Sequence, residues 1–230
     1  KTIRQFEERW VEFKNLTNTY EIDDYGLSHI SCEVFSQYNV TNQFNRPKRI
    51  CYNGRFFASY FLEYSAILFR ALEDSRRDTA IFSYTHLNVG HEISGTRIKH
   101  IDEDLARYLY AMTKYQNTLT MVFSDHGPKT TRYSFKTMEG RAEIYDPLLF
   151  MVVPKGVANM LGAGRMHGLI TNQKRLLSTL ELHSAMISLG DPKRENSNLY
   201  YKEGIFAPVP ANRTCEDITM KRTAVCKCEG

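Results

Sequence analysis

The chain has 230 residues, of which 42% are hydrophobic and 24% are charged, a composition typical of a globular protein rather than a disordered or fibrous one. Its net charge of +4 is small and its basic residues are scattered among acids, so the composition does not favour a nucleic-acid partner or a membrane surface. No apolar run is long enough to cross a bilayer, and a membrane span is therefore not expected.

The chain is predicted to form one domain with a flanking segment at each end. We expect a polar extension over residues 1–54, an α/β domain over residues 55–192 and a cysteine-containing tail over residues 193–230. No Pro/Gly/Ser-rich linker or internal repeat marks a further boundary. The first residue is Lys1 rather than a methionine followed by an apolar signal segment, which leads us to expect the C-terminal portion of a longer polypeptide.

Three elements are predicted in the first half of the chain. Apolar residues recur at helical spacing over residues 55–72, which predicts a helix that buries one broad face. The run AIFSY at residues 80–84 is rich in bulky and aromatic side chains and predicts a strand. Residues 97–115 repeat the helical pattern, with three acids near the start, where they suit the helix dipole.

Two further apolar runs, TLTMVFS at residues 118–124 and PLLFMVV at residues 147–153, predict strands that are buried on both faces. The strand predicted at residues 80–84, the helix predicted at residues 97–115 and the strand predicted at residues 118–124 follow one another in the order of a βαβ unit. Such a unit belongs to a parallel sheet. Residues 172–189 predict another covering helix, stopped by Gly190 and Pro192. The expected fold class is therefore α/β.

Polar side chains stand where two of the predicted strands end. The first strand is followed by His86, Asn88, His91 and Glu92, and the second by Asp125 and His126. Ligands bind beyond the carboxyl ends of parallel strands, and neighbouring strands of a βαβ unit bring their loops together. We therefore expect these side chains to meet in one pocket.

Asp125 and His126 indicate metal binding. An imidazole beside a carboxylate suits zinc, or manganese and iron, whereas calcium prefers oxygen ligands throughout. Gly127 lets the chain turn sharply after the pair, so the two side chains could reach two sides of a cleft and each hold a different ion. Two such ions would clamp the attacking and leaving oxygens of a phosphoryl transfer. The competing interpretation is a hydrogen-bonded loop histidine within a short motif that recurs by chance.

Three glycosylation sequons and five cysteines favour passage through the secretory route, and the expected localisation is extracellular or in the secretory-pathway lumen. The sequons lie at Asn15, Asn39 and Asn212. Cys32 and Cys51 bracket a polar segment, and Cys215, Cys226 and Cys228 lie in a tail poor in apolar residues. We expect disulfides that staple this tail, in preference to zinc binding, with one thiol left over because five is odd.

The residues Ser124 to Gly127, S-D-H-G at the end of a strand, resemble the metal-ligand motif of the alkaline phosphatase superfamily. More narrowly, the chain resembles the uncharacterised sulfatase-like extracellular family of animals, through FSYTHLNVGHE, NTLTMVFSDHG, EGRAEIYDPLLFMVVP and APVPANRTCED. The resemblance covers most of residues 50–228. It implies an alkaline-phosphatase-like sheet with covering helices that is incomplete on its N-terminal side.

The resemblance implies that Asp125 and His126 are metal ligands and that His91 is another. Related phosphodiesterases place an aspartate four residues before that histidine, where this chain has Leu87. Three alternatives follow: Asn88 supplies the missing ligand, His86 supplies it, or one metal position is weak or absent. A divalent ion is implied as the cofactor, with zinc favoured and manganese or calcium as alternatives.

Further residues are assigned by the resemblance or by their position near the motif. A late histidine ligand is implied, for which His167 is the candidate, whereas His183 lies on an apolar helical face and is expected in the core. Lys129 and Arg132 follow the ligands closely and could neutralise an oxyanion of the substrate. His86 is a further candidate for contact with the substrate.

The superfamily carries its first metal aspartate and its Ser, Thr or modified Cys nucleophile on an N-terminal half, and nothing before Phe56 resembles that half. We therefore expect a secreted metal-dependent hydrolase of phosphate or sulfate esters whose nucleophile lies outside this chain, with little or no turnover from the 230 residues alone. The alternatives are a catalytically silent extracellular binding or structural module with a sulfatase-like fold and an unrelated α/β enzyme. The expected partner is a small ester substrate or a glycan or lipid headgroup.

Overall fold

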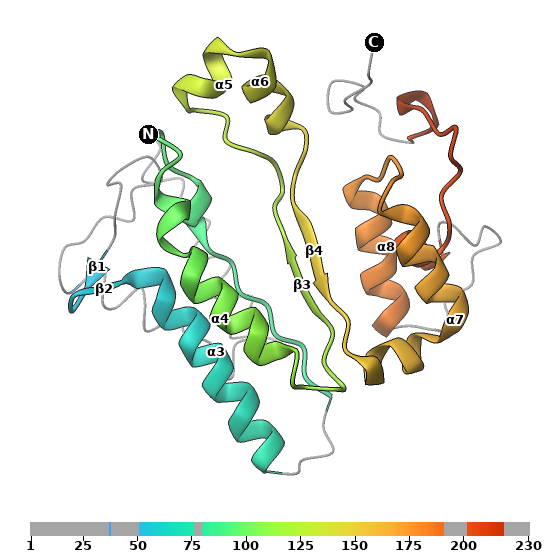
Figure 1. Ribbon diagram of the computed structural model, residues 1–230, viewed down its shortest axis with the longest axis horizontal. Coiled ribbons are helices and arrows are strands. Elements are labelled where there is room, and N and C mark those ends of the chain that lie inside the picture. The colour runs from blue at the N-terminus through green and yellow to red at the C-terminus, as the bar shows by residue number, and fades with distance from the viewer. Residues whose placement is uncertain (1–36, 38–50, 76–79, 191–201, 219–230) are drawn as a thin grey trace. The chain divides into compact units, whose positions relative to one another are not determined.

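The structure is a computed structural model that describes residue 37 and residues 51–75, 80–190 and 202–218 (Figure 1). All of these except residue 37 belong to one compact unit, Lys48–Gly230. The predictions for Asn15, Asn39, Cys32, Cys226 and Cys228 lie outside the described residues. Within the described ranges, no helix is both long enough and apolar enough to span a membrane.

The elements follow one another along the chain in this order. The short strands β1 (Cys51–Tyr52) and β2 (Arg55–Phe56) pair antiparallel and precede the helix α3 (Phe57–Asp74). The 3₁₀ turns η1 (Asn88–Gly90) and η2 (Arg97–His100) lead into α4 (Asp102–Met112). The strands β3 (Thr120–Phe123) and β4 (Leu149–Val152) enclose α5 (Arg132–Lys136) and α6 (Met138–Ile144). The helices α7 (Lys155–Asn172) and α8 (Thr179–Gly190) are followed by the 3₁₀ turns η3 (Gly204–Phe206) and η4 (Cys215–Asp217).

One hydrophobic core lies between α3 and α4, which pack side by side (Figure 1). Ala58 and Leu62 of α3 are buried there against Val89 and Ile101. The helices predicted over residues 55–72 and 97–115 are confirmed, although the first turn of the second one is the 3₁₀ turn η2. Helices are predictable from local patterns because their backbone hydrogen bonds form within the segment.

The strands predicted at residues 118–124 and 147–153 are confirmed as β3 and β4, but they pair antiparallel with each other rather than lying in a parallel sheet. The predicted βαβ unit of residues 80–84, 97–115 and 118–124 is wrong because its first strand is absent. Residues 80–84 form no strand and are exposed, because a strand needs a neighbour for its backbone hydrogen bonds and no described segment pairs with them. Burial on both faces was also wrongly predicted, since Phe123 and Phe150 are 43% and 47% exposed.

A second hydrophobic core forms where η3 packs against α7 and α8. Leu182 and Ala185 of α8 are buried there with Ile205 and Phe206 of η3. The helix predicted over residues 172–189 is confirmed only from Thr179 onward, and α7 was not predicted. His183 is exposed, which contradicts its predicted place in the core, because α8 turns its neighbour Leu182 rather than His183 inward.

The described residues therefore form a helix-rich mixed fold with a small antiparallel sheet, which is compatible with the predicted α/β class. Cys51 is a free and exposed thiol. Cys215, the other cysteine that the structure describes, is disulfide-bonded rather than free. The pairing of the predicted staple of the tail lies outside the described residues.

Candidate functional site

The motif at residues 124–127 lies where the chain leaves β3 and turns toward α5 (Figure 1). The segment between β3 and β4 is joined at its base by Ser124 and Leu148. The Ser124 backbone N–H donates to the Leu148 carbonyl at 3.0 Å, and the Ser124 Oγ accepts from the Leu148 N–H at 3.0 Å. Gly127 closes this segment again by donating its N–H to the Ile144 carbonyl at 3.0 Å. A side chain at position 127 would overlap the backbone of α6, so this approach requires glycine. We call residues 124–127, 144 and 148 the neck.

Asp125 projects from the neck into solvent, with 86% of its side chain exposed. One carboxylate oxygen, Oδ1, accepts a hydrogen bond from the backbone N–H of His126 at 3.0 Å. The other, Oδ2, lies 3.5 Å from Nε2 of His126. The two side chains therefore face one another rather than reaching two sides of a cleft, as was predicted. The reason is the turn at the neck, which brings consecutive side chains to the same side.

The imidazole of His126 has a defined tautomer. Its Nδ1 lies 2.6 Å from the carbonyl oxygen of Gly127, and because a carbonyl oxygen can only accept, Nδ1 carries the proton. In the neutral ring Nε2 then presents a lone pair toward the Asp125 carboxylate. Two acceptors that face each other this closely are stabilised by a proton on Nε2, by a donating solvent molecule or by a cation.

The geometry of the pair fits two ligands of one metal ion. Two ligand atoms about 2.1 Å from a tetrahedral zinc ion lie about 3.4 Å apart, which matches the 3.5 Å between Asp125 Oδ2 and His126 Nε2. That separation is longer than an ordinary N–H···O hydrogen bond. A ligating histidine also commonly donates its other N–H to a backbone carbonyl, as His126 does to Gly127.

His86 and Asn88 lie in a hydrogen-bonded chain that begins at Tyr84. The side-chain oxygen of Asn88 accepts from His86 Nε2 at 3.0 Å, so the opposite nitrogen, Nδ1, is free of hydrogen and accepts from the Tyr84 hydroxyl at 3.3 Å. Both ring nitrogens of His86 are thus engaged. A metal ion or substrate at Asn88 or His86 would have to replace one of these bonds. Sequence analysis did not single out Tyr84, whose only signal is its position two residues before His86.

Glu92 belongs to the interior rather than to a pocket, which corrects its predicted place. It is 2% exposed, and its carboxylate accepts hydrogen bonds from the Ser94 hydroxyl and from the backbone N–H groups of Ser94, Thr96 and Arg97. Burial raises the pKa of Glu92, but these hydrogen bonds outweigh it and lower the pKa to about 2. Arg97, also 2% exposed, donates to the Asn88 carbonyl at 3.4 Å. The spacing E-x-S-x-T-R is the sequence signal for this internal anchor.

The loop that carries His91 lies against the chain segment that follows the neck. A Cβ atom at Gly95 would be 3.2 Å from the Thr131 methyl group, and Thr131 comes four residues after Gly127. His91 is exposed at the end of η1, where its backbone N–H donates to the Asn88 carbonyl at 3.3 Å. The structure thus brings the two predicted ligand loops into contact at Gly95 and Thr131.

The remaining predicted site residues are exposed and dispersed over several elements. Lys129 precedes α5, Arg132 begins it, His167 lies on α7 and Asn212 lies beyond η3. Across residues 51–75, 80–190 and 202–218, no group of three or more His, Cys, Asp and Glu side chains is arranged to hold a metal ion. Asp125 and His126 are the predicted ligands whose side chains the described structure brings together, at 3.5 Å.

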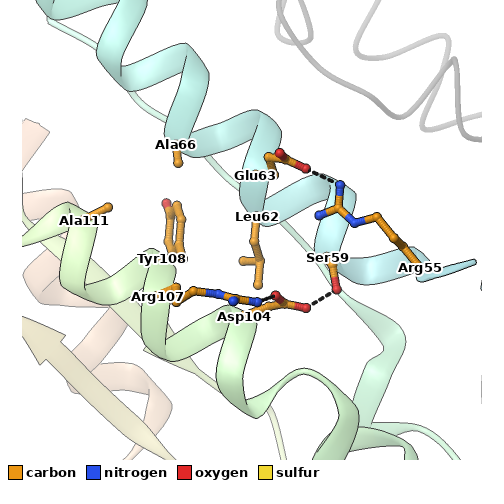
Figure 2. A pocket seen from close by; sticks show the side chains of 9 residues that line it. All are labelled: Arg55, Ser59, Leu62, Glu63, Ala66, Asp104, Arg107, Tyr108 and Ala111. Carbon is orange, nitrogen blue, oxygen red and sulfur yellow. Dashed lines mark hydrogen bonds and ion pairs between the residues drawn. The ribbon is translucent and has the colours of Figure 1, made fainter.

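A cleft of about 390 Å³ lies elsewhere, between α3 and α4 (Figure 2). Its polar groups pair with one another: Arg55 with Glu63 at 2.6 Å, and Asp104 with both Ser59 and Arg107. The hydrogen bond from Ser59 lowers the pKa of Asp104, and Arg107 adds to this effect, while burial opposes it. None of the predicted site residues lines the cleft. The hydrogen bond from Ser59 of α3 to Asp104 of α4 joins the two helices across it.

Comparison with known proteins finds a match to a protein family. The family described as "Protein of unknown function (DUF229)" matches residues 21–230, which is most of the chain. No curated protein and no solved structure matches the sequence.

Proposed function

The chain belongs to the DUF229 family, and from this membership we propose that it is part of a sulfatase-like, metal-dependent hydrolase of phosphate or sulfate esters. The observation that carries the proposal is the pair of facing acceptors, Asp125 Oδ2 and His126 Nε2, separated by 3.5 Å. Such a pair offers two ligand atoms at the separation that one tetrahedral zinc ion requires.

In the proposed site, Asp125 and His126 hold a divalent ion, with zinc favoured over manganese and calcium because one donor is an imidazole. The carbonyl of Gly127 fixes the imidazole through Nδ1 and leaves Nε2 to bind the ion. The bound ion acts as a Lewis acid on the ester oxygen and lowers the pKa of bound water.

Other residues complete the proposed site from nearby segments. His91 is the proposed third ligand, because its loop contacts the segment after the neck at Gly95 and Thr131. Lys129, exposed two residues after Gly127, places a positive charge where the anionic ester would approach. His86 and Asn88 are proposed to contact the substrate or ion after exchange of their present hydrogen bonds, and His167 is retained as a late ligand.

We further propose that the protein acts in the secretory pathway or outside the cell. The exposure of Asn212 meets one requirement of its predicted glycosylation, since a glycan needs an accessible asparagine. A small phosphate or sulfate ester, or the headgroup of a glycan or lipid, is the proposed substrate.

A second function, a silent extracellular module of the same fold, is favoured by one observation. The described residues assemble two metal-ligand positions rather than three or more. Catalytic zinc sites ordinarily use three protein ligands, so a two-ligand site binds metal weakly and positions a substrate poorly.

Zinc titration by calorimetry separates these functions. We expect the wild-type chain and the control variant His183→Ala, which removes an exposed histidine of α8, to bind zinc, and His126→Ala to bind at least tenfold more weakly. Equal zinc binding by all three proteins would contradict the proposed site. Weak zinc binding by the wild-type chain that is lost in His126→Ala would instead favour the silent module, whose two-ligand site binds metal weakly.

A further inference from the structure

The exposed side of α5 is unusual in its polarity. Tyr133, Phe135 and Met138 are 47%, 66% and 73% exposed, although they are the large apolar side chains of this segment. The inward positions belong instead to the small residues Ser134 and Gly140. Helices of water-soluble domains ordinarily turn their apolar face inward, so the polarity of this short helix is inverted.

Basic side chains outnumber acids beside these apolar side chains. Three exposed basic residues lie among them between residues 129 and 138, and one exposed acid, Glu139, directly follows Met138. No acid within the described part of the chain forms an ion pair with these three cations. We define the α5 surface as Lys129, Arg132, Tyr133, Phe135, Lys136 and Met138.

The α5 surface is held outward by the packing of α5 on α6. Thr131 caps α5 by accepting from the Ser134 N–H at 3.1 Å, and Thr137 caps α6 by accepting from the Gly140 N–H at 2.9 Å. A side chain at Gly140 would overlap the backbone of Tyr133, so the two helices approach as closely as glycine permits. The space between the two helices therefore admits Ser134 and Gly140 but no large side chain.

We infer that the α5 surface binds peripherally to an anionic lipid membrane. Lysine and arginine attract anionic headgroups, while exposed aromatic and methionine side chains enter the boundary with the acyl chains. A hydrated polyanion such as a sulfated polysaccharide would also attract the cations, but it would leave Phe135 and Met138 in water. The apolar exposure is thus the observation that selects a membrane as the partner.

The small net charge of the whole chain conceals this surface, because acids elsewhere balance the local cations. The α5 surface lies beyond the ends of β3 and β4, at the tip of the segment that the three hydrogen bonds of the neck close off (Figure 1). Contact with a membrane there requires no spanning helix. The inference stands independently of the proposed hydrolase function.

Co-sedimentation of the full chain with phosphatidylcholine vesicles, with and without phosphatidylserine, tests the inference. We expect binding that requires phosphatidylserine and weakens at high salt. The double variant Phe135→Ser/Met138→Ser should bind about tenfold or more weakly. Lys136→Glu should lose about fivefold or more.

Matched controls use residues of the same exposure elsewhere in the chain. Met160 and Ile170 of α7 are 66% and 63% exposed, so Met160→Ser/Ile170→Ser should bind vesicles as the wild type does, and Lys174→Glu should match it as well. Equal losses in test and control variants would overturn the inference. So would retention on immobilised heparin without vesicle binding, which would make the α5 surface a polyanion site.

Discussion

Polar side chains play different roles in two regions of the molecule, the α7–α8 pair and the neck. Between α7 and α8, Asn172 donates to the carbonyls of Ile205 and Ala207 and accepts from the Val209 N–H, all within 2.9 Å. Glu181 and Arg213, 3% and 6% exposed, pair at 3.2 Å. These polar groups replace water with protein partners and thereby fix the segment after η3 to the helices.

In the neck, the hydrogen bonds of Ser124 and Gly127 fix the backbone, whereas Asp125 Oδ2 and His126 Nε2 face each other as acceptors. The comparison teaches how to separate two kinds of polar residue. A group whose hydrogen bonds are satisfied internally supports the fold. An acceptor on a fixed backbone that has no donor within the protein is available to bind a ligand.

The largest expected effect falls on the α7–α8 side of this comparison. A Cβ atom at Gly168 would overlap the carbonyl of Phe206, so Gly168→Ala should lower the free energy of unfolding by about 3 kcal/mol or more. Urea denaturation measures this change. Gly164→Ala, in open space on the same helix, is the control and should stay within about 1 kcal/mol of the wild type. A similar loss in both variants would show that glycine flexibility, rather than close packing, matters in α7.

The buried carboxylate of Glu92 should produce the next largest effect, as a dependence of stability on pH. Its pKa falls from 4.5 to about 2 on folding, so the stabilisation is complete above pH 4.5 and is lost as the pH falls toward 2. The contribution amounts to about 2 to 3 kcal/mol. Unfolding free energies measured across this range should decline more steeply for the wild type than for Glu92→Gln. Parallel curves would place the acid-sensitive group elsewhere.

Removal of the Asn172 side chain should cost somewhat less. Asn172→Ala breaks three hydrogen bonds to the segment after η3, and we expect a loss of about 2 kcal/mol in the free energy of unfolding. Asn159→Ala changes the same residue type at an exposed position of α7 and should be neutral within about 0.5 kcal/mol. Hydrogen exchange should also accelerate at the Val209 amide in Asn172→Ala alone.

The smallest expected change in the free energy of unfolding is that of a substitution in the neck. Asp125 is 86% exposed, and Asp125→Ala should change the free energy of unfolding by no more than about 0.5 kcal/mol. The same variant should lose zinc affinity. A destabilisation above about 1 kcal/mol with unchanged zinc affinity would make Asp125 a structural residue and remove the distinction between the two regions.

Sequence patterns predicted the elements that depend on local interactions. The helical spacing of apolar residues over residues 55–72 and 97–115 was sufficient to predict α3 and α4. The strand predicted at residues 80–84 failed because strand formation depends on a neighbouring strand, which the period of one segment does not reveal. The helix α7 escaped prediction because glycine is a poor helix former, yet Gly168 is required there for close packing.

The candidate site was predictable in its residue types and not in its geometry. A carboxylate and an imidazole at the end of an apolar strand indicated Asp125 and His126, but their 3.5 Å approach depends on the turn at Gly127. Glu92 was misplaced for a related reason. The same residue type serves as a ligand or as an internal anchor according to the donors around it, and here Ser94, Thr96 and Arg97 supply them.

X-ray absorption spectroscopy of the zinc-loaded chain tests the central claim, that Asp125 and His126 bind one ion together. We predict a first shell of nitrogen and oxygen at about 2.0 to 2.1 Å with the multiple scattering of an imidazole. The imidazole signal should disappear in His126→Ala and persist in His183→Ala. An imidazole signal that is unchanged in His126→Ala would place the zinc on another histidine and contradict the account.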